Sequence, residues 1–435
     1  MNYLVGVLVL FVGLLASIAL HEVGHMLPAK RFGVRVSQYM VGFGPTLWSR
    51  IRGETEYGVK AIPLGGYVRL VGMYPPPDAV GNPPVKGWLG RVAQEARVAS
   101  HEEIHPGEDH RAFYRLSTPK KLIVMLGGPV MNLVIAAVLL TVMLVGIGQP
   151  TATSTVASVT GCVPAAGATK CAAGDPQSPA AVAGLVAGDV VTKFDGVAIS
   201  SWSQLSDLIR ATGGGAVPIV VTRDGVERSL TVTPVRVPRP VVDAAGKAVL
   251  GKDGRALTKP GGFLGIGPKI VLEGQPWSTV PQSLGSALVG TVKIVATLPA
   301  RVGDVARSVF GSAPRAQDSV IGIVGMGRIA GDITAGGGGD FGLTGVVQGM
   351  LSLLFSLNLS LFALNLIPLV PLDGGHVASA LWEGVRRQAA RLRGLPRPRP
   401  VDVARMMPLA YGMFVLLAGV GLLLIYADIV RPVTL

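Results

Sequence analysis

Two histidines and one glutamate lie together in the stretch HEVGH, as His21, Glu22 and His25. The stretch matches the pattern H-E-x-x-H. On a helix, a spacing of four places both imidazoles on one face, about one turn apart, where they can share one zinc ion. Glu22 projects next to that face and can take a proton from a water bound to the metal. The residue types and their spacing therefore predict a zinc site with Glu22 as a catalytic base.

The position of HEVGH at the end of an apolar run supports this prediction. Tyr3–Leu20 is an 18-residue run without charge, long enough to span a hydrocarbon core. Ionisable groups at membrane depth are costly, so they are functional candidates. The alternative is a pair of interfacial histidines with a snorkelling glutamate. A signal peptide is disfavoured, because the run lacks a basic n-region and an A-x-A-like cleavage site.

A third zinc ligand is predicted in the stretch NLIPLVPLDGGH, residues 365–376. Asp373 follows another uncharged run, and the two glycines after it let the backbone bend close to a metal. Pro368 and Pro371 break a helix and leave backbone carbonyls unpaired, which is tolerable only against protein or a wet cavity. His376 is a rival fourth ligand. Four protein ligands would make a structural site, so an orienting role is favoured for His376.

The composition indicates a membrane protein. Of 435 residues, 49% are hydrophobic and 15% charged, and the mean hydropathy is +0.50. This balance is too apolar for an ordinary soluble enzyme and too interrupted by polar stretches for a simple channel bundle. We predict a polytopic α-helical membrane protein with about four transmembrane helices, carried by four uncharged runs: Tyr3–Leu20, Leu122–Gly148, Val346–Leu372 and Met406–Ala427.

The net charge of +13 is distributed as in a membrane protein. Lys and Arg number 14 in residues 30–121 and 7 in 386–405, but only 17 across the much longer 149–345. Positive charge marks cytoplasmic loops, so the N-terminus and 149–345 are predicted outside the cytoplasm. The basic clusters suit anionic lipid heads, and no nucleic-acid-binding motif accompanies them. We therefore predict contact with the lipid bilayer and none with nucleic acid.

Cys162 and Cys171 are the only cysteines, and both fall in the stretch predicted outside. An oxidising compartment and a spacing of nine favour a small disulfide loop. Two unpaired thiols in a mobile loop are the alternative. The spacing C-x8-C has no zinc signature.

Residues 152–236 have the pattern of a compact soluble domain. SPAAVAGLVAGDVVTKFDGVAI places a short helix before a Gly-Asp turn, a strand and a tight turn, and SWSQLSDLIR has helical spacing. VPIVVTRDGVERSLTVTPV reads as a hairpin around Asp224-Gly225. This order resembles a PDZ domain of membrane-associated proteases, which implies binding of an extended segment at a sheet edge. A rigid spacer that gates access sterically is the alternative.

The remaining stretches follow from composition. Residues 39–73 show short alternating runs of β type, typical of hairpins, and 277–310 suit a helix on the membrane surface. The predicted regions in order are the first transmembrane helix with HEVGH (1–38), a membrane-associated β-hairpin region (39–73), a cytosolic loop (74–119), the second transmembrane helix (120–149), an extracytoplasmic PDZ-like α+β domain (150–238), an extracytoplasmic insertion with a surface helix (239–345), the third transmembrane helix with the LDG motif (346–385), a basic cytosolic loop (386–405), and the fourth transmembrane helix with a short outer tail (406–435).

The motifs together resemble the site-2 protease family, intramembrane zinc metalloproteases, and most closely its bacterial branch that cleaves anti-sigma factors. They are HEVGH, GGPVMN at 127–132, one PDZ-like domain, and N-x-x-P-x-x-P-L-D-G from Asn365, in the family's order. One feature departs from the family's usual N-x-x-P-x-P-x-x-D-G. Pro368 and Pro371 are three residues apart, while the interval from Asn365 to Asp373 is kept.

The resemblance implies roles for single residues. His21, His25 and Asp373 would hold one zinc ion per chain. Asn365 would hold the substrate backbone near the metal, beside Pro368 and Pro371. Asn132 would do similar work, or would form an interhelical hydrogen bond. The β-hairpin region would pair with substrate unwound into a strand, because a helical peptide bond is shielded by its own hydrogen bonds.

The resemblance also implies a substrate class and a location. Substrates would be single-span membrane proteins, either an anti-sigma factor or a signal-peptide remnant. The protein would be a multi-pass protein of the plasma membrane, with its active site near the cytoplasmic side.

Two other functions fit parts of the sequence. The first is an ion or proton transporter that uses His21, Glu22, His25 and Asp373 as a relay, but transporters usually show internal repeats and more spans. The second is an inactive scaffold that binds envelope proteins through the PDZ-like domain. The presence of all three ligands and the base argues against a scaffold.

Overall fold

The computed structural model describes residues 2–164, 171–241, 257–311, 315–316 and 319–433. Contacts divide the chain into two compact units, Met1–Gly146 with Pro276–Leu435, and Ile147–Gln275. We name the first the membrane unit and the second the inserted unit.

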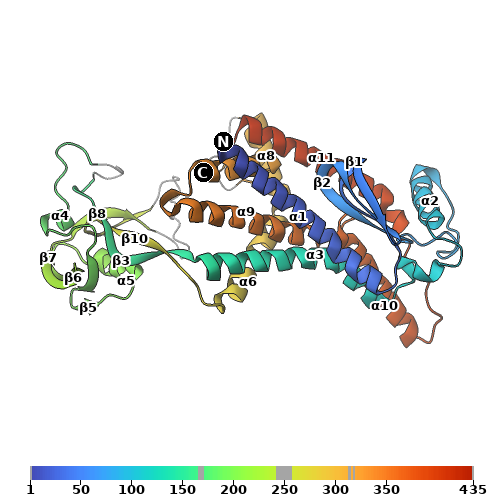
Figure 1. Cartoon of the computed structure of the whole chain (residues 1–435), viewed down its shortest axis with the longest axis horizontal. Coiled ribbons are helices and arrows are strands. Elements are labelled where there is room, and N and C mark those ends of the chain that lie inside the picture. Colours follow the sequence, from blue (N-terminus) through green and yellow to red (C-terminus); the bar gives the residue numbers. More distant parts are fainter. Residues whose placement is uncertain (1, 165–170, 242–256, 312–314, 317–318, 434–435) are drawn as a thin grey trace. The chain divides into compact units, whose positions relative to one another are not determined.

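The membrane unit holds, within the described residues, four helices long and apolar enough to cross a membrane, as the four uncharged runs predict. Many of their leucine and valine side chains are exposed on the chain, as expected where lipid is the neighbour. These helices are α1 (Asn2–Arg31), α3 (Thr118–Thr141, continued by a π-helical turn at Val142–Ile147), α9 (Gly342–Asn365) and α11 (Met407–Val430, preceded by a 3-10 turn at Val403–Met406) (Figure 1).

Glycines let α1 and α3 approach closely. A Cβ added to Gly24 would lie 2.3 Å from the backbone oxygen of Gly127, and one added to Gly127 would lie 2.0 Å from that of Gly24. The two helices therefore cross backbone against backbone, which is the packing that small residues allow between membrane helices. The crossing lies inside HEVGH, so α3 is brought directly against the predicted metal ligands.

The region 346–385, predicted as the third transmembrane helix with the LDG motif, holds parts of two helices with the predicted break at the prolines between them. α9 ends at Asn365, and a separate helix, α10 (Asp373–Leu392), begins at Asp373. Pro368 and Pro371 lie in the break and have no backbone N–H to donate to a helix. As a result, Asp373 occupies the first position of a helix rather than the middle of one.

Two helices were not predicted. The expected loop 74–119 contains α2 (Gly87–Glu102), followed by 3-10 turns at Asp109–Arg111 and Phe113–Arg115. The region 239–345 contains α8 (Ile323–Ala335), followed by a 3-10 turn at Gly339–Phe341. α8 is too short for a span and is buried through Ala330 against α1 and α9.

The predicted surface helix at 277–310 is two helices. They are α6 (Thr279–Ala296) and α7 (Leu298–Phe310), which meet at an angle of 61°. Pro299 stands at the second position of α7, where proline starts a helix but cannot continue one. Counted as one broken element, the pair is a candidate for a fifth span among the described residues.

The 39–73 region forms one long hairpin, with β1 at Val36–Arg52 and β2 at Thr55–Leu70. The hairpin folds back on itself, because residues 38–41 pair both with 56–59 and with 66–69. Its strand segments therefore lie side by side in the order 46–52, 55–60, 36–43 and 62–70. The last of these has, among the described residues, a strand partner on one side only, and we call its residues 66–70 the edge segment.

The inserted unit contains a mixed structure of strands around two helices. Its main sheet has the strand order β10-β3-β4-β6-β7, with β5 on β4, and β8 pairs with β9. The elements are β3 (Gln149–Val159), α4 (Pro179–Val182), β4 (Val190–Phe194), β5 (Val197–Ala198), α5 (Trp202–Ala211), β6 (Val217–Arg223), β7 (Val226–Val232), β8 (Val235–Pro240), β9 (Thr258–Phe263) and β10 (Ile266–Glu273). The core is apolar and is centred on Phe194, Leu205 and Ile219.

The predicted boundary of this domain at 238 is too early. β10 pairs with β3 along its length, so the unit closes only near Gln275. Residues 239–241 and 257–275 thus belong to this unit rather than to a separate insertion, and 242–256 lie outside the described residues. Cys162 and Cys171 are joined by a disulfide, with their Cα atoms 5.9 Å apart.

Candidate active site

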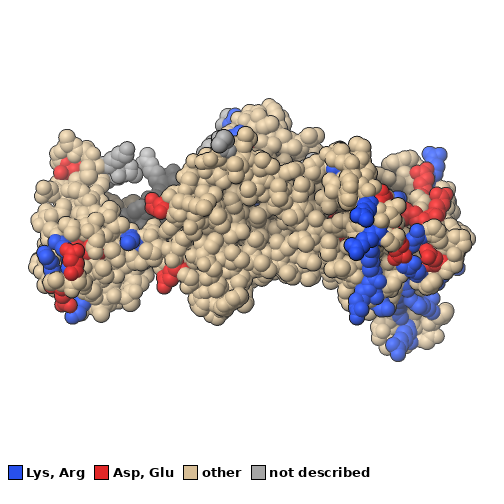
Figure 2. All heavy atoms as spheres, viewed as in Figure 1, with Lys and Arg blue, Asp and Glu red and all other residues tan. Residues whose placement is uncertain are grey.

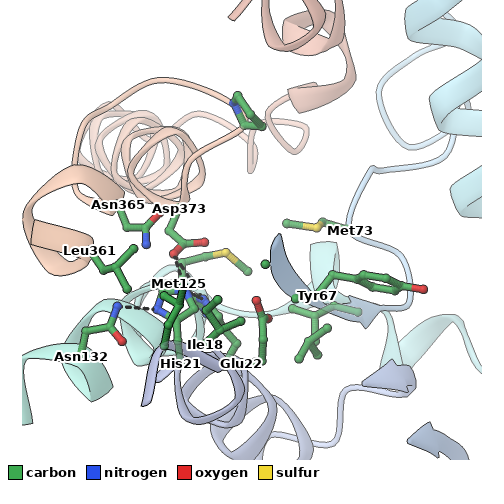
Figure 3. Close-up of a pocket in the computed structure, with 17 residues that line it drawn as sticks. Ile18, His21, Glu22, Tyr67, Met73, Met125, Asn132, Leu361, Asn365 and Asp373 are labelled. Atoms are coloured by element: carbon green, nitrogen blue, oxygen red, sulfur yellow. Dashed lines mark hydrogen bonds and ion pairs between the residues drawn. The ribbon is translucent and has the colours of Figure 1, made fainter. Parts of the chain in front are cut away.

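α1 places both histidines of HEVGH on one face. The Nε2 atoms of His21 and His25 lie 3.2 Å apart, and the two side chains are only 11% and 8% exposed. A helix repeat of 3.6 residues produces this arrangement directly from the spacing. The imidazoles therefore present two nitrogen atoms to one point, and the imidazole of His21 can be followed in Figure 3.

Asp373 supplies a third atom at the same point. Its Oδ2 lies 3.2 Å from His21 Nε2 and 3.3 Å from His25 Nε2. In tetrahedral zinc sites, bonds of about 2.0–2.1 Å place neighbouring ligand atoms about 3.3 Å apart. The three atoms thus have the spacing of one face of a zinc tetrahedron, and this donor set fits zinc with a fourth position left for water.

The far nitrogens of both rings contact α3. His25 Nδ1 lies 2.8 Å from the backbone oxygen of Val124, which can only accept, so Nδ1 carries the proton and Nε2 keeps its lone pair. The side-chain amide nitrogen of Asn132 lies 3.0 Å from His21 Nδ1. Asn132 is fully buried, and its Oδ1 has no hydrogen-bond partner within the described residues. Asn132 is therefore a neighbour of a predicted ligand.

Gly128 makes room for the cluster. A Cβ at this position would lie 2.2 Å from His25 Nε2 and 2.7 Å from His21 Nε2. Any side chain here would occupy the point on which the two nitrogens converge. The sequence GGP thus has two distinct tasks, helix contact at Gly127 and space for the ligands at Gly128.

Glu22 lies in a cavity of about 540 Å³ next to the three ligand atoms. The backbone N–H of Val68 faces its carboxylate, and Gly66 lies so close that an added Cβ would be 3.1 Å from Glu22 Cγ. The edge segment of β2 thus passes directly beside the predicted base (Figure 3). The cavity is lined by Leu14, Ile18, His21, Glu22, His25, Gly65, Gly66, Tyr67, Val68, Leu70, Met73, Met125, Asn132, Leu361, Asn365, Pro371 and Asp373.

Tyr39 connects the hairpin to α1 just before this site. Its hydroxyl donates a hydrogen bond of 2.8 Å to the backbone oxygen of Ala19. Burial raises the pKa of Tyr39 to about 12, and the carboxylate of Glu22 acts in the same direction. The hydroxyl therefore remains a donor at neutral pH and holds the hairpin against the helix.

The other predicted site residues do not all lie in the active-site cavity. Asn365 and Pro371 line the cavity, and Asn365 lies beside Asp373 (Figure 3). Pro368 is exposed and is not among the lining residues. His376 lines a different, small cavity and does not join the metal-ligand cluster found among the described residues. The role of fourth ligand, which the sequence analysis disfavoured for His376, is therefore not supported by its position, and the orienting role favoured there stays a prediction.

One buried group that sequence analysis missed anchors the helix of Asp373. Lys121 of α3 donates a hydrogen bond of 2.8 Å to Glu383 of α10, and their side chains are 7% and 4% exposed. Arg387 pairs with the same carboxylate. A buried pair of this kind costs several kcal/mol when one partner is removed, so it fixes α10 against α3. The charge of Lys121 at the start of an apolar run was the available signal.

Comparison with known proteins shows that this chain is similar to metalloproteases. Residues 9–397 match the family model described as Peptidase family M50. The chain is 35% identical to zinc metalloprotease Rip1 of Mycobacterium tuberculosis, over the whole of both chains. It is 28% identical to metalloprotease MmpA of Caulobacter vibrioides, over 89% of this chain and 90% of that protein. It is 25% identical to zinc metalloprotease RasP of Geobacillus kaustophilus, over 85% of this chain and 87% of that protein.

Proposed function

This chain belongs to peptidase family M50, the site-2 proteases, and is a zinc metalloprotease; on this premise we propose that it cuts single-span membrane proteins within or near their membrane-spanning segment. The observation that carries the proposal is the convergence of three ligand atoms beside Glu22 in one cavity. His21, His25 and Asp373 would hold the zinc ion. Glu22 is the catalytic base.

The residues around the metal have separate tasks in hydrolysis. Zinc, when bound, polarises the scissile carbonyl and makes water a stronger acid. Glu22 takes the proton from the attacking water and passes it to the nitrogen of the leaving amine. Asn365, on the opposite wall of the cavity, holds the substrate backbone by its amide. Pro371 keeps the neighbouring backbone out of a helix, so that the chain around Asp373 stays next to the cavity.

Asn132 orients His21. The amide nitrogen of Asn132 lies 3.0 Å from His21 Nδ1, and the amide oxygen is buried without a hydrogen-bond partner among the described residues. With Nε2 of His21 directed at a metal, Nδ1 would carry the proton, and a half-turn of the Asn132 amide would let its oxygen accept a hydrogen bond from Nδ1. Of the two sequence-based interpretations of Asn132, the interhelical hydrogen bond is thus favoured over substrate binding.

The edge segment of β2 binds the substrate as an added strand. A peptide bond in a transmembrane helix is shielded by its own hydrogen bonds, so it must unwind before it is cut. An unwound chain in the membrane needs new backbone partners. The edge segment supplies them beside Glu22, and the cavity wall made by Leu14, Ile18 and Leu361 accommodates apolar side chains.

The protein lies in the plasma membrane with its active site near the cytoplasmic side. Lys and Arg gather at one end of the membrane unit, where α2 and α10 lie (Figure 2). The rest of the membrane unit shows few charged side chains on this face. The excess of positive charge marks the cytoplasmic end. By alternation, the N-terminus and the PDZ-like inserted unit are outside the cytoplasm. A disulfide between Cys162 and Cys171 suits that compartment.

The inserted unit controls which substrates reach the site, either by capturing a chain end or by excluding bulky outer domains. The substrate class is anti-sigma factors, with signal-peptide remnants as the second candidate. The transporter and scaffold functions are disfavoured, because neither requires three ligand atoms at zinc spacing beside a glutamate.

The experiment compares the purified wild type with Glu22→Gln in detergent. We expect one zinc ion per chain in both and cleavage of a model single-span substrate by the wild type alone. Glu95→Gln, an exposed glutamate on α2, is the matched control and should keep full activity. Absence of zinc from both proteins would overturn the ligand assignment, and cleavage by Glu22→Gln would overturn the assignment of the base.

A further inference from the structure

We propose that the cytoplasmic flank of the substrate, just beyond the cut, lies in a groove between the edge segment of β2 and helix α2. This inference rests on the proposed function and extends it from the scissile bond to the residues that follow. It assigns α2, which has no role in the chemistry, to substrate selection.

The groove is continuous with the active-site cavity. A second cavity of about 500 Å³ adjoins the first and shares four lining residues with it: Tyr67, Val68, Leu70 and Met73. A third, of about 460 Å³, shares Gln38, Arg69 and Glu103 with the second. The three hollows therefore neighbour one another in a row that starts at Glu22.

The edge segment borders the first two cavities along its length. It pairs with residues 36–41 on one side, and its other side faces the cavities. The N–H of Val68 points toward Glu22, away from β1. A strand that is added here at Glu22 continues, at about 3.3 Å per residue, past Arg69 and Leu70 into the second cavity. The path and the backbone partners thus run in the same direction.

α2 forms the opposite wall with small side chains. Ala96, Ala99 and Ser100 line the second cavity from this helix. Ser100 is already engaged, because its hydroxyl donates to the backbone oxygen of Tyr74 and accepts from the N–H of the same residue. The alanines present no bulky side chain to the cavity.

The wall is fixed in place by a buried ion pair. Arg97 of α2 donates two hydrogen bonds, of 3.0 and 2.6 Å, to the carboxylate of Asp402, and their side chains are 3% and 11% exposed. This bidentate contact ties α2 to the segment before α11. A fixed wall selects substrates by the size of their side chains, because α2 cannot move away to make room for a bulky one.

The chemistry of the path changes from apolar to charged. It begins at Leu14, Ile18 and Leu361 in the first cavity and reaches the ion pair of Arg69 with Glu103, at 2.7 Å, in the second. The third cavity is lined mostly by polar and charged groups, including Arg35, Glu54 and His105. A chain that leaves the membrane changes in the same order, so the occupant is the juxtamembrane flank of the substrate, with small residues facing α2.

A cross-linking experiment tests the location. Glu22→Gln is combined with Ala99→Cys, which faces the groove, or with Val98→Cys, its exposed neighbour that is not a lining residue. The two native cysteines are paired, so each introduced thiol is the only free one. Model single-span substrates carry one cysteine at successive flank positions, and mild oxidation follows. We expect disulfides with Ala99→Cys at a few positions roughly three to six residues from the cut, by strand rise. Equal cross-linking at Val98→Cys, or none at Ala99→Cys, would overturn the proposal.

A kinetic experiment tests the selection. Ala99→Trp should lower kcat/KM about tenfold for a substrate with a long flank and leave a substrate trimmed just beyond the cut unaffected, while Val98→Trp changes neither. An equal loss of kcat/KM for both substrates would contradict the proposal. It would indicate that a lipid occupies the groove or that the variant has a structural defect. Failure of the wild type to cut either substrate would refute the proposed function, and the cross-linking result would still decide the groove.

Discussion

Buried polar groups serve different purposes in the two units of this protease. In the membrane unit they contact one another across helices, as Asn132 does with His21 and Lys121 with Glu383. In the inserted unit the core is apolar, and the buried polar residues in its described part are Ser178, which caps α4, and Asp189, which pairs with Arg223. The hydrophobic effect does not drive helices together in lipid, so close packing and polar contacts must hold them. In water, the hydrophobic effect does stabilise the apolar core of the inserted unit.

The comparison teaches where catalytic groups can be built. Polar contacts between helices place ligand atoms at defined distances, and the same contacts stabilise the unit. An apolar core stabilises without placing any reactive group. The two units should therefore respond independently to changes aimed at one of them.

Removal of the metal should produce the largest difference between the units. Dialysis against a chelator is expected to abolish cleavage, with recovery when zinc is returned, because the attack on the peptide bond requires the metal. Amide hydrogen exchange of β4 and β6 in the full chain should stay unchanged. Loss of protection in these strands on chelation would show that the two units are coupled.

Gly128→Ala should abolish zinc binding at the same site without a chelator. The added methyl group would occupy the point shared by the two imidazole nitrogens, so we expect loss of zinc and at least a hundredfold loss of activity. Metal analysis of the purified variant checks this. Gly419→Ala on α11, where an added Cβ meets nothing within 4 Å, is the control and should behave as wild type.

The positions of the proposed zinc ligands were predictable because their signals are local. HEVGH brings two histidine nitrogens together by helix periodicity alone, and Asp373 follows two prolines that interrupt the helix before it. The four spans follow from uncharged length in the same way. In each case the information lies within about one element of sequence.

What could not be predicted depends on contacts between distant segments. The inserted unit ends near Gln275 because β10 pairs with β3, a partner more than a hundred residues earlier that no local pattern identifies. The contact of Asn132 with His21 and the return of the hairpin on itself have the same origin. α2 was missed because Pro- and Gly-rich sequence around it reads as loop.

Phe194→Ala should give the converse of metal removal. Phe194 is fully buried in the core of the inserted unit, and truncation of such a residue costs about 3–5 kcal/mol. Hydrogen exchange of β4 and β6 should accelerate accordingly, while the zinc content stays at that of the wild type. Val226→Ala, an exposed position in the same unit, should alter neither quantity. Loss of zinc from the Phe194 variant would refute the independence of the units.

Asn132→Ala should weaken zinc binding without abolishing it. Loss of a group that orients a metal-bound histidine typically lowers affinity by about 10- to 100-fold. Competition with a zinc chelator of known affinity measures the change. Asn132→Asp keeps an oxygen that can accept the proton of His21 Nδ1 and should restore most of the affinity. A variant that binds zinc as tightly as the wild type but cuts poorly would instead support substrate binding by Asn132.

The smallest effect is expected from the ion pair that the fully buried Asp189 of the inserted unit forms with Arg223. Arg223 donates hydrogen bonds of 2.7 and 2.9 Å to Asp189, and these bonds hold the pKa of that carboxyl below its usual value. A lowered pKa in the folded state means that the unfolded chain takes up the proton first as pH falls. The pair therefore stabilises the unit above the usual pKa of about 3.9 and loses this contribution as pH falls through the folded value.

Hydrogen exchange of β4 and β6 should be faster in Asp189→Asn than in wild type at pH 7, and the difference should shrink below about pH 4. Asp207→Asn, whose side chain is 74% exposed, should show no such difference at either pH. If the difference in hydrogen exchange between Asp189→Asn and wild type persists at low pH, the contact is stabilised by packing and not by the charge of Asp189.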